Sequence, residues 1–285
     1  MDRQLSGGSI PRTVRDVTSA EDELPSRVEL LADADRPGGW LLTIDRIRQS
    51  YVDLDDPTYL DFEYIQTIAD VINALPDGPL AVTHVGGGGC TLARYIAATR
   101  PGSSQIVLEP DGEVTATVRA RLPLPARSRI KVRPIDGRAG MAELHDASAD
   151  VVVLDAFSGG RVPRELTTLE FMTDVARVLR PAGVFLANVA DGPSLAYTRR
   201  LAATVRTVLP QVLVSTAGGK GRRFGNVVLA GARRGLPVAE VRRAAAAAPF
   251  PRTTRLDIGR EARPLRDDDS LRSPEPPEEI WRVSD

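Results

Sequence analysis

The sequence predicts an α/β fold in which a seven-stranded, mostly parallel Rossmann-like sheet follows a small N-terminal β-sheet. Two observations support this prediction. From residue 80 onward, short runs of consecutive apolar residues alternate with helix-length stretches, as in βαβ units whose sheet is covered on both faces. Four consecutive glycines, 86–89, follow the first of these runs, at the edge where open parallel sheets bind ligands.

The segment before this alternation predicts a small antiparallel sheet and one helix. Residues 1–26 are polar and lack apolar periodicity, which indicates a flexible lead. Residues 27–54 hold three strand-like runs, and a helix is expected over 59–75. The predicted division of the chain is a lead (1–26), a small β-sheet plus helix (27–75), a Rossmann-like domain (77–250) and an irregular C-terminal tail (251–285).

The large sheet is predicted element by element from the apolar runs. Its expected strands are 80–85, 105–108, 129–132, 151–154, 184–189, 212–215 and 226–230. The expected helices are 91–99, 113–122, 168–179, 195–208 and 239–247. A glycine-rich link at 218–221 joins the last two strands without a helix, so this pair should be antiparallel.

Composition excludes several classes of partner and cofactor. The 37 basic residues nearly balance the 38 acidic ones, which gives no electrostatic basis for nucleic acid or an anionic membrane as partner. One cysteine, Cys90, and two histidines argue against a disulfide or a metal site. No apolar run approaches the roughly 20 residues that span a bilayer, and no signal peptide is evident. We therefore expect a cytoplasmic protein without a metal.

Polar groups after the first three strands of the large sheet predict a nucleoside site. The glycine run lets the backbone pass close to a ligand, with free N–H groups at the start of the next helix. Glu109 ends the second strand, where a carboxylate can accept both ribose hydroxyls; the alternative is a surface acid. Asp136 follows the third strand and can reach an adenine amino group; the alternative is a helix cap. The candidate nucleoside-binding residues here are Gly86, Gly87, Gly88, Glu109, Asp136 and Gly137.

Nicotinamide dinucleotide is the rival ligand, because the glycine run and Glu109 fit it as well. The glycines are consecutive, however, and do not follow the G-x-G-x-x-G spacing of dinucleotide-binding proteins. The antiparallel final pair of strands is typical of a class I methyltransferase-type sheet. These two features favour an S-adenosyl-type nucleoside.

Asp155 ends the fourth strand and is expected to face the reactive end of this nucleoside. A carboxylate there can orient an amine and accept its proton as the amine attacks a carbon next to a sulfonium. The alternative interpretation is a helix cap. Residues 159–166, which follow, have the glycine and proline content of a mobile lid.

The stretch 150–186 resembles the fourth-strand segment of the spermidine synthase (polyamine aminopropyltransferase) family. It is most similar to a spermidine-synthase-like branch with Asp-Ala-Phe-Ser-Gly after the strand and Leu-Thr-Thr at 166–168. The resemblance also takes in the glycine run, Glu109 and Asp136-Gly137, and it covers roughly residues 40 to 270.

This resemblance implies transfer of an aminopropyl group from decarboxylated S-adenosylmethionine to an amine, with no metal because the sulfonium is already activated. It implies that Asp155 is the catalytic acid/base and that Gln49 contacts the nucleoside. It also implies that Tyr64 lines the amine channel and that Ser158 stands where the family has a second acid. Homodimer formation is implied as well. In agreement with this, the small sheet is too small to bury its large apolar residues, Trp40, Leu41, Ile44, Tyr51 and Leu54.

The chain departs from the family at positions that bind cationic amines. Gly89 replaces the aspartate of the Gly-Gly-Gly-Asp-Gly-Gly motif, Ser158 replaces the second acid, and Ile65-Gln66 replace a His-Glu pair. Each lost charge-assisted contact is worth about 1.5–3 kcal/mol, so losing two weakens polyamine binding by roughly a hundred- to ten-thousandfold. On this basis, Gly89→Asp is expected to improve binding of the decarboxylated donor.

Three functions remain open at this point. The first is an aminopropyltransferase-like enzyme acting on a small amine. The second is an S-adenosylmethionine-dependent methyltransferase for another small acceptor, since Gly89 removes the contact specific to the decarboxylated donor. The third is a non-catalytic nucleoside-binding homologue.

Overall fold

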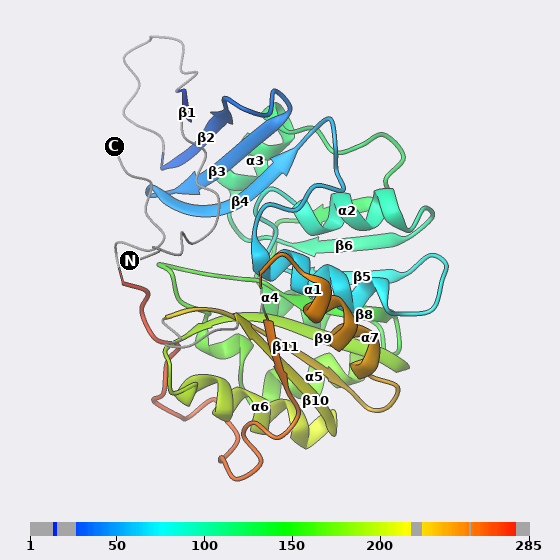
Figure 1. Ribbon diagram of the computed structural model, residues 1–285, viewed down its shortest axis with the longest axis vertical. Helices are drawn as coiled ribbons and strands as arrows, with labels where there is room; N and C mark the ends of the chain where they lie inside the picture. Colours follow the sequence, from blue (N-terminus) through cyan, green and yellow to red (C-terminus); the bar gives the residue numbers. More distant parts are fainter. Residues whose placement is uncertain (1–13, 16–26, 218–223, 251, 278–285) are drawn as a thin grey trace, which may run out of the picture.

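A computed structural model of the chain describes residues 14–15, 27–217, 224–250 and 252–277 (Figure 1). The expected flexible lead therefore lies outside the described residues, apart from 14–15, and so does the glycine-rich link at 218–221. No helix in the described part of the chain has the length and apolar character to cross a membrane.

The large sheet has eight strands and confirms the predicted fold class. Their bounds are β5 Ala81–Val85, β6 Ser104–Leu108, β7 Ile130–Arg133, β8 Ala149–Leu154, β9 Leu179–Asp191, β10 Gln211–Ala217, β11 Gly225–Ala232 and β12 Arg252–Arg255. The order is β12-β10-β11-β9-β8-β5-β6-β7. The five strands from β9 to β7 are parallel, and β11 is antiparallel to both β9 and β10, as the short link predicted. The eighth strand, β12, is antiparallel to β10 and lies in the stretch expected to be irregular.

Helices cover both faces of this sheet. They are α1 Glu63–Asn73, α2 Thr91–Thr99, α3 Gly112–Arg121, α4 Gly137–Ala142, α5 Leu169–Val178, α6 Ala196–Val208 and α7 Val238–Ala247, with a 3₁₀ turn, Arg164–Leu166. On one face α1 and α7 lie side by side (Figure 1) and share an apolar cluster with α2. On the other face α4, α5 and α6 pack together. In β8, Val151 and Val153 belong to the first face and Val152 and Leu154 to the second, which explains the consecutive apolar residues.

The small sheet packs on α3. It consists of β1 Val14–Arg15, β2 Val28–Asp33, β3 Gly39–Ile44 and β4 Ile47–Asp53, all antiparallel. Its inner residues form one apolar cluster with α3, made of Val28, Leu42, Val52, Val114, Val118 and Leu122. Leu41 and Tyr51, expected at a dimer interface, are buried within the chain itself, whereas Leu54 is exposed. Leu41 and Tyr51 therefore give no support to a dimer interface.

Candidate active site

A cleft of about 900 Å³ lies at the carboxyl ends of the parallel strands, bordered by the small sheet and α1. This is the edge at which open α/β sheets bind ligands. The cleft brings together all the residues singled out from the sequence: Gln49, Tyr64, Gly86, Gly87, Gly88, Glu109, Asp136, Gly137, Asp155 and Ser158. They come from β4, from α1 and from the segments that follow β5, β6, β7 and β8.

Glu109 is fixed by the backbone of the glycine run. Its Oε2 accepts hydrogen bonds from the N–H groups of Gly87 (2.9 Å) and Gly88 (3.2 Å), and its Oε1 accepts one from the N–H of Asp111 (3.0 Å). The N–H groups of Gly87 and Gly88 are thus used by this carboxylate. Because each carboxylate oxygen has two lone pairs, Oε1 keeps capacity for a ligand hydroxyl.

Gly86 is required where the loop passes β8. Its φ is +98°, and a Cβ there would lie 2.2 Å from the backbone oxygen of Asp155. Any other residue would push the loop and the end of β8 apart, so this glycine sets the distance between the glycine run and the candidate catalytic residue Asp155.

Asp136 caps α4. Its Oδ1 accepts hydrogen bonds from the N–H groups of Arg138 (2.8 Å) and Ala139 (3.1 Å). Asp136 is thus a helix cap, the alternative that the sequence also allowed. The side chain nevertheless lines the cleft, and Oδ2 takes no part in these two bonds. Gly137 packs closely on β5, since a Cβ would lie 2.5 Å from Cγ1 of Val85.

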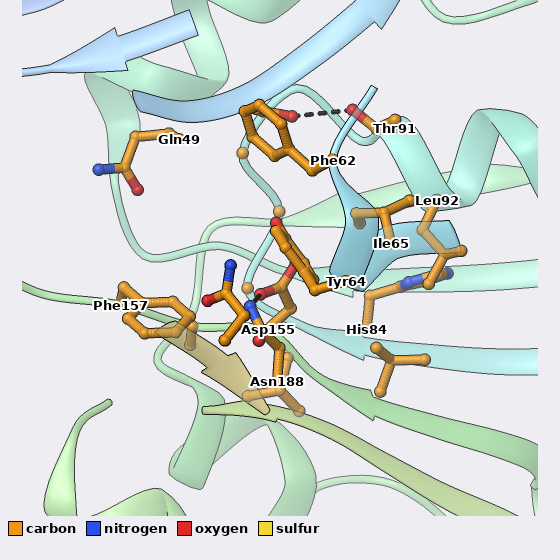
Figure 2. A pocket seen from close by; sticks show the side chains of 18 of the residues that line it. Gln49, Phe62, Tyr64, Ile65, His84, Thr91, Leu92, Asp155, Phe157 and Asn188 are labelled. Carbon is orange, nitrogen blue, oxygen red and sulfur yellow. Dashed lines mark hydrogen bonds between the residues drawn. The ribbon is translucent and has the colours of Figure 1, made fainter. Parts of the chain in front are cut away.

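Asp155 is held by two neutral donors (Figure 2). The amide Nδ2 of Asn188 donates to its Oδ1 at 2.9 Å, and the hydroxyl of Tyr64 donates to its Oδ2 at 3.2 Å. Burial raises the pKa of Asp155 above its usual value, and the two hydrogen bonds oppose this rise. Burial also raises the pKa of Tyr64 well above its usual value, so the phenol stays protonated as a donor. A carboxylate held in this way can accept a proton from a bound molecule.

Asn188 is a site residue that sequence reasoning missed. It lies within β9, in a run of apolar residues, and only 1% of its surface is exposed. An asparagine inside a buried strand must find hydrogen-bond partners, and that is the signal that could have identified it. The bond to Asp155 fixes the amide orientation, with Nδ2 toward the carboxylate.

The segment expected to be a mobile lid, 159–166, is tied to the C-terminal part of the chain. The N–H of Val162 donates to Oγ of the buried Ser273 (2.9 Å), and Arg164 donates to the backbone oxygen of Asp269 (2.5 Å). Arg161 also forms an ion pair with Glu275 (2.5 Å). Ser158, exposed at the start of this segment, lines the cleft.

The space next to Gly89 is filled by β4. A Cβ at this position would lie 2.7 Å from Cγ2 of Val52 and 3.0 Å from Oγ of Ser50. Ser50 in turn is 2.8 Å from the hydroxyl of Thr91, which donates to the backbone oxygen of Tyr51 (2.7 Å). The small sheet is therefore in direct contact with the start of α2 at the position where the resemblance implied an acidic side chain.

This packing changes the expected result of Gly89→Asp. We now expect the single variant to lower the melting temperature, because Val52 is buried and cannot move away. Gly89→Asp combined with Val52→Ala should recover much of that loss. Differential scanning calorimetry of both variants, with Val52→Ala alone as control, checks this. A single variant as stable as the parent protein would contradict the steric argument.

Comparison with known proteins places this chain in a family. A probable spermidine synthase from Corynebacterium glutamicum has a solved structure that is 30% identical, with a TM-score of 0.78; the match covers 87% of this chain and 95% of that one. Polyamine aminopropyltransferases from Chromobacterium violaceum and Neisseria meningitidis are 31% and 26% identical over 145 residues. The chain spans about half the length of these curated relatives, 55% in each case.

One further comparison concerns the fold. Human methyltransferase-like protein 13, solved in complex with SAH, shares the fold at 22% identity and a TM-score of 0.54, over 64% of this chain and 90% of that one. No family model matches the sequence. The Corynebacterium match, at 30% identity over nearly the whole of that structure, decides the assignment. The chain belongs to the spermidine synthase (polyamine aminopropyltransferase) family.

Proposed function

We propose that the protein is an aminopropyltransferase that takes an S-adenosyl-type donor, in the first place decarboxylated S-adenosylmethionine, and a small amine acceptor. The observation that carries this proposal is the Asp155 carboxylate, held between Asn188 and Tyr64 beside the glycine run. In a chain of this family, such a group is suited to act as the base for an attacking amine.

The residues of the cleft fit an S-adenosyl-type nucleoside. Glu109 would accept hydrogen bonds from the ribose hydroxyls, chiefly through Oε1, and Asp136 would accept from the adenine amino group through Oδ2. Gln49 lines the same cleft and would contact the nucleoside from the small sheet. The donor supplies a carbon made electrophilic by the neighbouring sulfonium.

Asp155 would take the proton released in the reaction. As the acceptor nitrogen forms its bond to the donor carbon, the carbon–sulfur bond breaks and methylthioadenosine leaves with the sulfur electron pair. The nitrogen then loses a proton to Asp155, whose raised pKa favours accepting it. Tyr64 and Asn188 orient the carboxylate, and Tyr64 would also border the amine.

An S-adenosylmethionine-dependent methyltransferase is the second candidate. It is favoured by one observation, the replacement of the family's motif aspartate by Gly89, whose side-chain space is filled by Val52. A carboxylated donor then meets no like charge at this position. A third candidate is a homologue that binds the nucleoside without catalysis.

Isothermal titration with S-adenosylmethionine, its decarboxylated form and methylthioadenosine separates the two enzymatic candidates. Binding of the decarboxylated donor and methylthioadenosine, with S-adenosylmethionine at least tenfold weaker, supports the proposal. Binding of S-adenosylmethionine alone would favour the methyltransferase. Absence of binding by all three would refute both enzymatic proposals.

The rate of transfer should rise with pH through the pKa of Asp155, since only the ionised carboxylate accepts a proton. Tyr64→Phe removes a hydrogen bond that lowers this pKa. The acidic limb of the kcat/KM profile should therefore move to higher pH. Tyr95→Phe is the matched control, because the Tyr95 hydroxyl pairs with Asn73 (3.1 Å) and does not contact Asp155. An acidic limb that stays in place or moves to lower pH in Tyr64→Phe would contradict the role of this hydrogen bond.

We also propose that the protein is cytoplasmic and forms a homodimer through the small sheet. Deleting residues 1–54 would uncover Val114 and Val118 of α3, so a point substitution is the better test. Leu54→Asp at the exposed end of β4 should shift light scattering of the full chain from dimer to monomer mass. A parent protein that scatters as a monomer at all concentrations would rule the dimer out.

A further inference from the structure

The cleft continues past Asp155 across the floor of the sheet, beneath α1. Its lining there includes the polar residues Asn188 on β9, Asn226 on β11, Ser215 on β10 and Arg252 on β12, with Val228 of β11 between Asn188 and Ser215. Asn188 and Ser215 are both paired with Val228 of β11, so they lie in one row across three strands. Two strand spacings separate them by roughly 10 Å. This extension can hold the part of an acceptor molecule that does not react.

Three buried polar atoms in this extension have no hydrogen-bond partner among the described residues. They are Oδ1 of Asn188, Oγ of Ser215 and Nε of Arg252. Buried polar groups are normally paired in folded proteins, so three unpaired ones lining one cleft indicate a site for a bound molecule. Arg252 lies opposite Ala217, two residues along β10 from Ser215. The chemistry of the three atoms differs: Asn188 Oδ1 only accepts, Ser215 Oγ does both, and Arg252 Nε only donates.

Arg252 defines the chemistry at the far end. Its side chain is 8% exposed, its Nη2 forms an ion pair with Asp70 (2.6 Å), and its Nη1 donates to Oγ1 of Thr67 (2.7 Å). Asp70 balances the guanidinium charge, and Nε, which has no partner among the described residues, is a donor. The Arg252–Asp70 pair is thus neutral overall, and Nε calls for an oxygen that accepts a hydrogen bond.

We propose that the acceptor is a primary amine whose opposite end carries a hydroxyl or carboxylate oxygen, and not a second ammonium group. This inference rests on the proposed function. The reacting amine would donate to Asp155 and Asn188 Oδ1, and the distant oxygen would accept from Arg252 Nε and Ser215. A diamine would instead place its second ammonium beside a guanidinium that offers it only a donor.

Glu63 is the group that could favour a diamine. It opens α1, lines the same cleft and stands one helical turn before Thr67, which contacts Arg252. Its side chain is partly exposed, so solvent screens its charge, whereas the unpaired atoms of the floor are buried. The test therefore includes Glu63→Gln.

Three four-carbon probes that differ only at the far end test the proposal: 1,4-diaminobutane, 4-aminobutan-1-ol and 4-aminobutanoate. Each is titrated into the full chain saturated with methylthioadenosine. We expect at least one oxygen-ended probe to bind at least tenfold more tightly than the diamine, and the order of the two identifies hydroxyl or carboxylate. Equal binding of the three probes would overturn the inference and leave the proposed function intact. So would a diamine that binds most tightly to the parent protein and loses this advantage in Glu63→Gln. Failure to bind methylthioadenosine would overturn both.

Arg252→Lys tests the group responsible. Lysine keeps a cation for Asp70 but lacks Nε, so the preference for an oxygen-ended probe should fall to within about threefold. Arg243→Lys on the exposed face of α7 is the matched control and should change nothing. Ser215→Ala removes the hydroxyl at the same end without touching the ion pair, and it should weaken the oxygen-ended probes about three- to tenfold. If Arg252→Lys and Ser215→Ala both fold and both keep the full preference for oxygen-ended probes, this extension is not the acceptor site.

Discussion

Asp155→Asn is expected to lower the rate of transfer by about 10²–10⁴-fold, the range that general acid–base catalysis contributes, or to abolish detectable turnover. Asparagine has nearly the same shape and can still pair with Asn188 and Tyr64, but its amide cannot accept a proton. Because Asp155 follows β8 and is expected to face the reactive end of the nucleoside, nucleoside affinity should stay within about tenfold. Single-turnover rates and titration with methylthioadenosine measure the two effects separately.

Stability supplies the control for this variant. Burial raises the pKa of Asp155, so the folded state holds the proton more tightly than the unfolded chain does, and the ionised form costs stability at neutral pH. Asp155→Asn removes that cost, so its melting temperature at pH 7 should equal or exceed that of the parent. Asp150→Asn, at the other end of β8, should leave the rate unchanged. A folded Asp155→Asn protein with full activity would show that the acid/base assignment is wrong.

Glu109→Ala is expected to weaken nucleoside binding about ten- to a hundredfold, equivalent to roughly 1.5–3 kcal/mol of lost hydrogen bonding to ribose. The rate at saturating donor should change little. The alanine variant also frees the N–H groups of Gly87 and Gly88, so part of its effect would come from the loop itself.

Glu109→Gln separates the two contributions. Its amide oxygen can still accept from the loop N–H groups, while the charge that strengthens the ribose contacts is gone. Its affinity for methylthioadenosine, measured by titration, should lie between those of the parent and the alanine variant. Glu143→Gln, at the exposed end of α4, is the control. An affinity within twofold of the parent for Glu109→Ala would mean that ribose is bound elsewhere.

The central sheet could be predicted because its strands are buried on both faces. Consecutive apolar residues such as Val151 to Leu154 have no other stable arrangement in a βαβ alternation. The edge strand β12 reads Arg-Thr-Thr-Arg and carries no such run, and α4 has only six residues, so neither has a periodic signal. Both depend on tertiary contacts, with β10 in one case and the Asp136 cap in the other.

Only the candidate site residues that directly follow a strand could be predicted from the sequence. Asp155 and Glu109 each follow a recognisable strand, so topology alone brings them to one edge. The partners of these residues could not be found in this way. Asn188 acts from inside a strand, and Val52 fills the space beside Gly89 from another sheet, so both contacts depend on side-chain packing between distant segments.

Formation of methylthioadenosine tests the central claim most directly. The full chain is incubated with decarboxylated S-adenosylmethionine, with and without a primary amine, and the nucleosides are quantified by mass spectrometry. We predict that methylthioadenosine accumulates only when the amine is present, in a one-to-one ratio with an amine product heavier by one aminopropyl group, and that Asp155→Asn stops it. Formation of S-adenosylhomocysteine from S-adenosylmethionine, with no methylthioadenosine from the decarboxylated donor under any condition, would contradict the account.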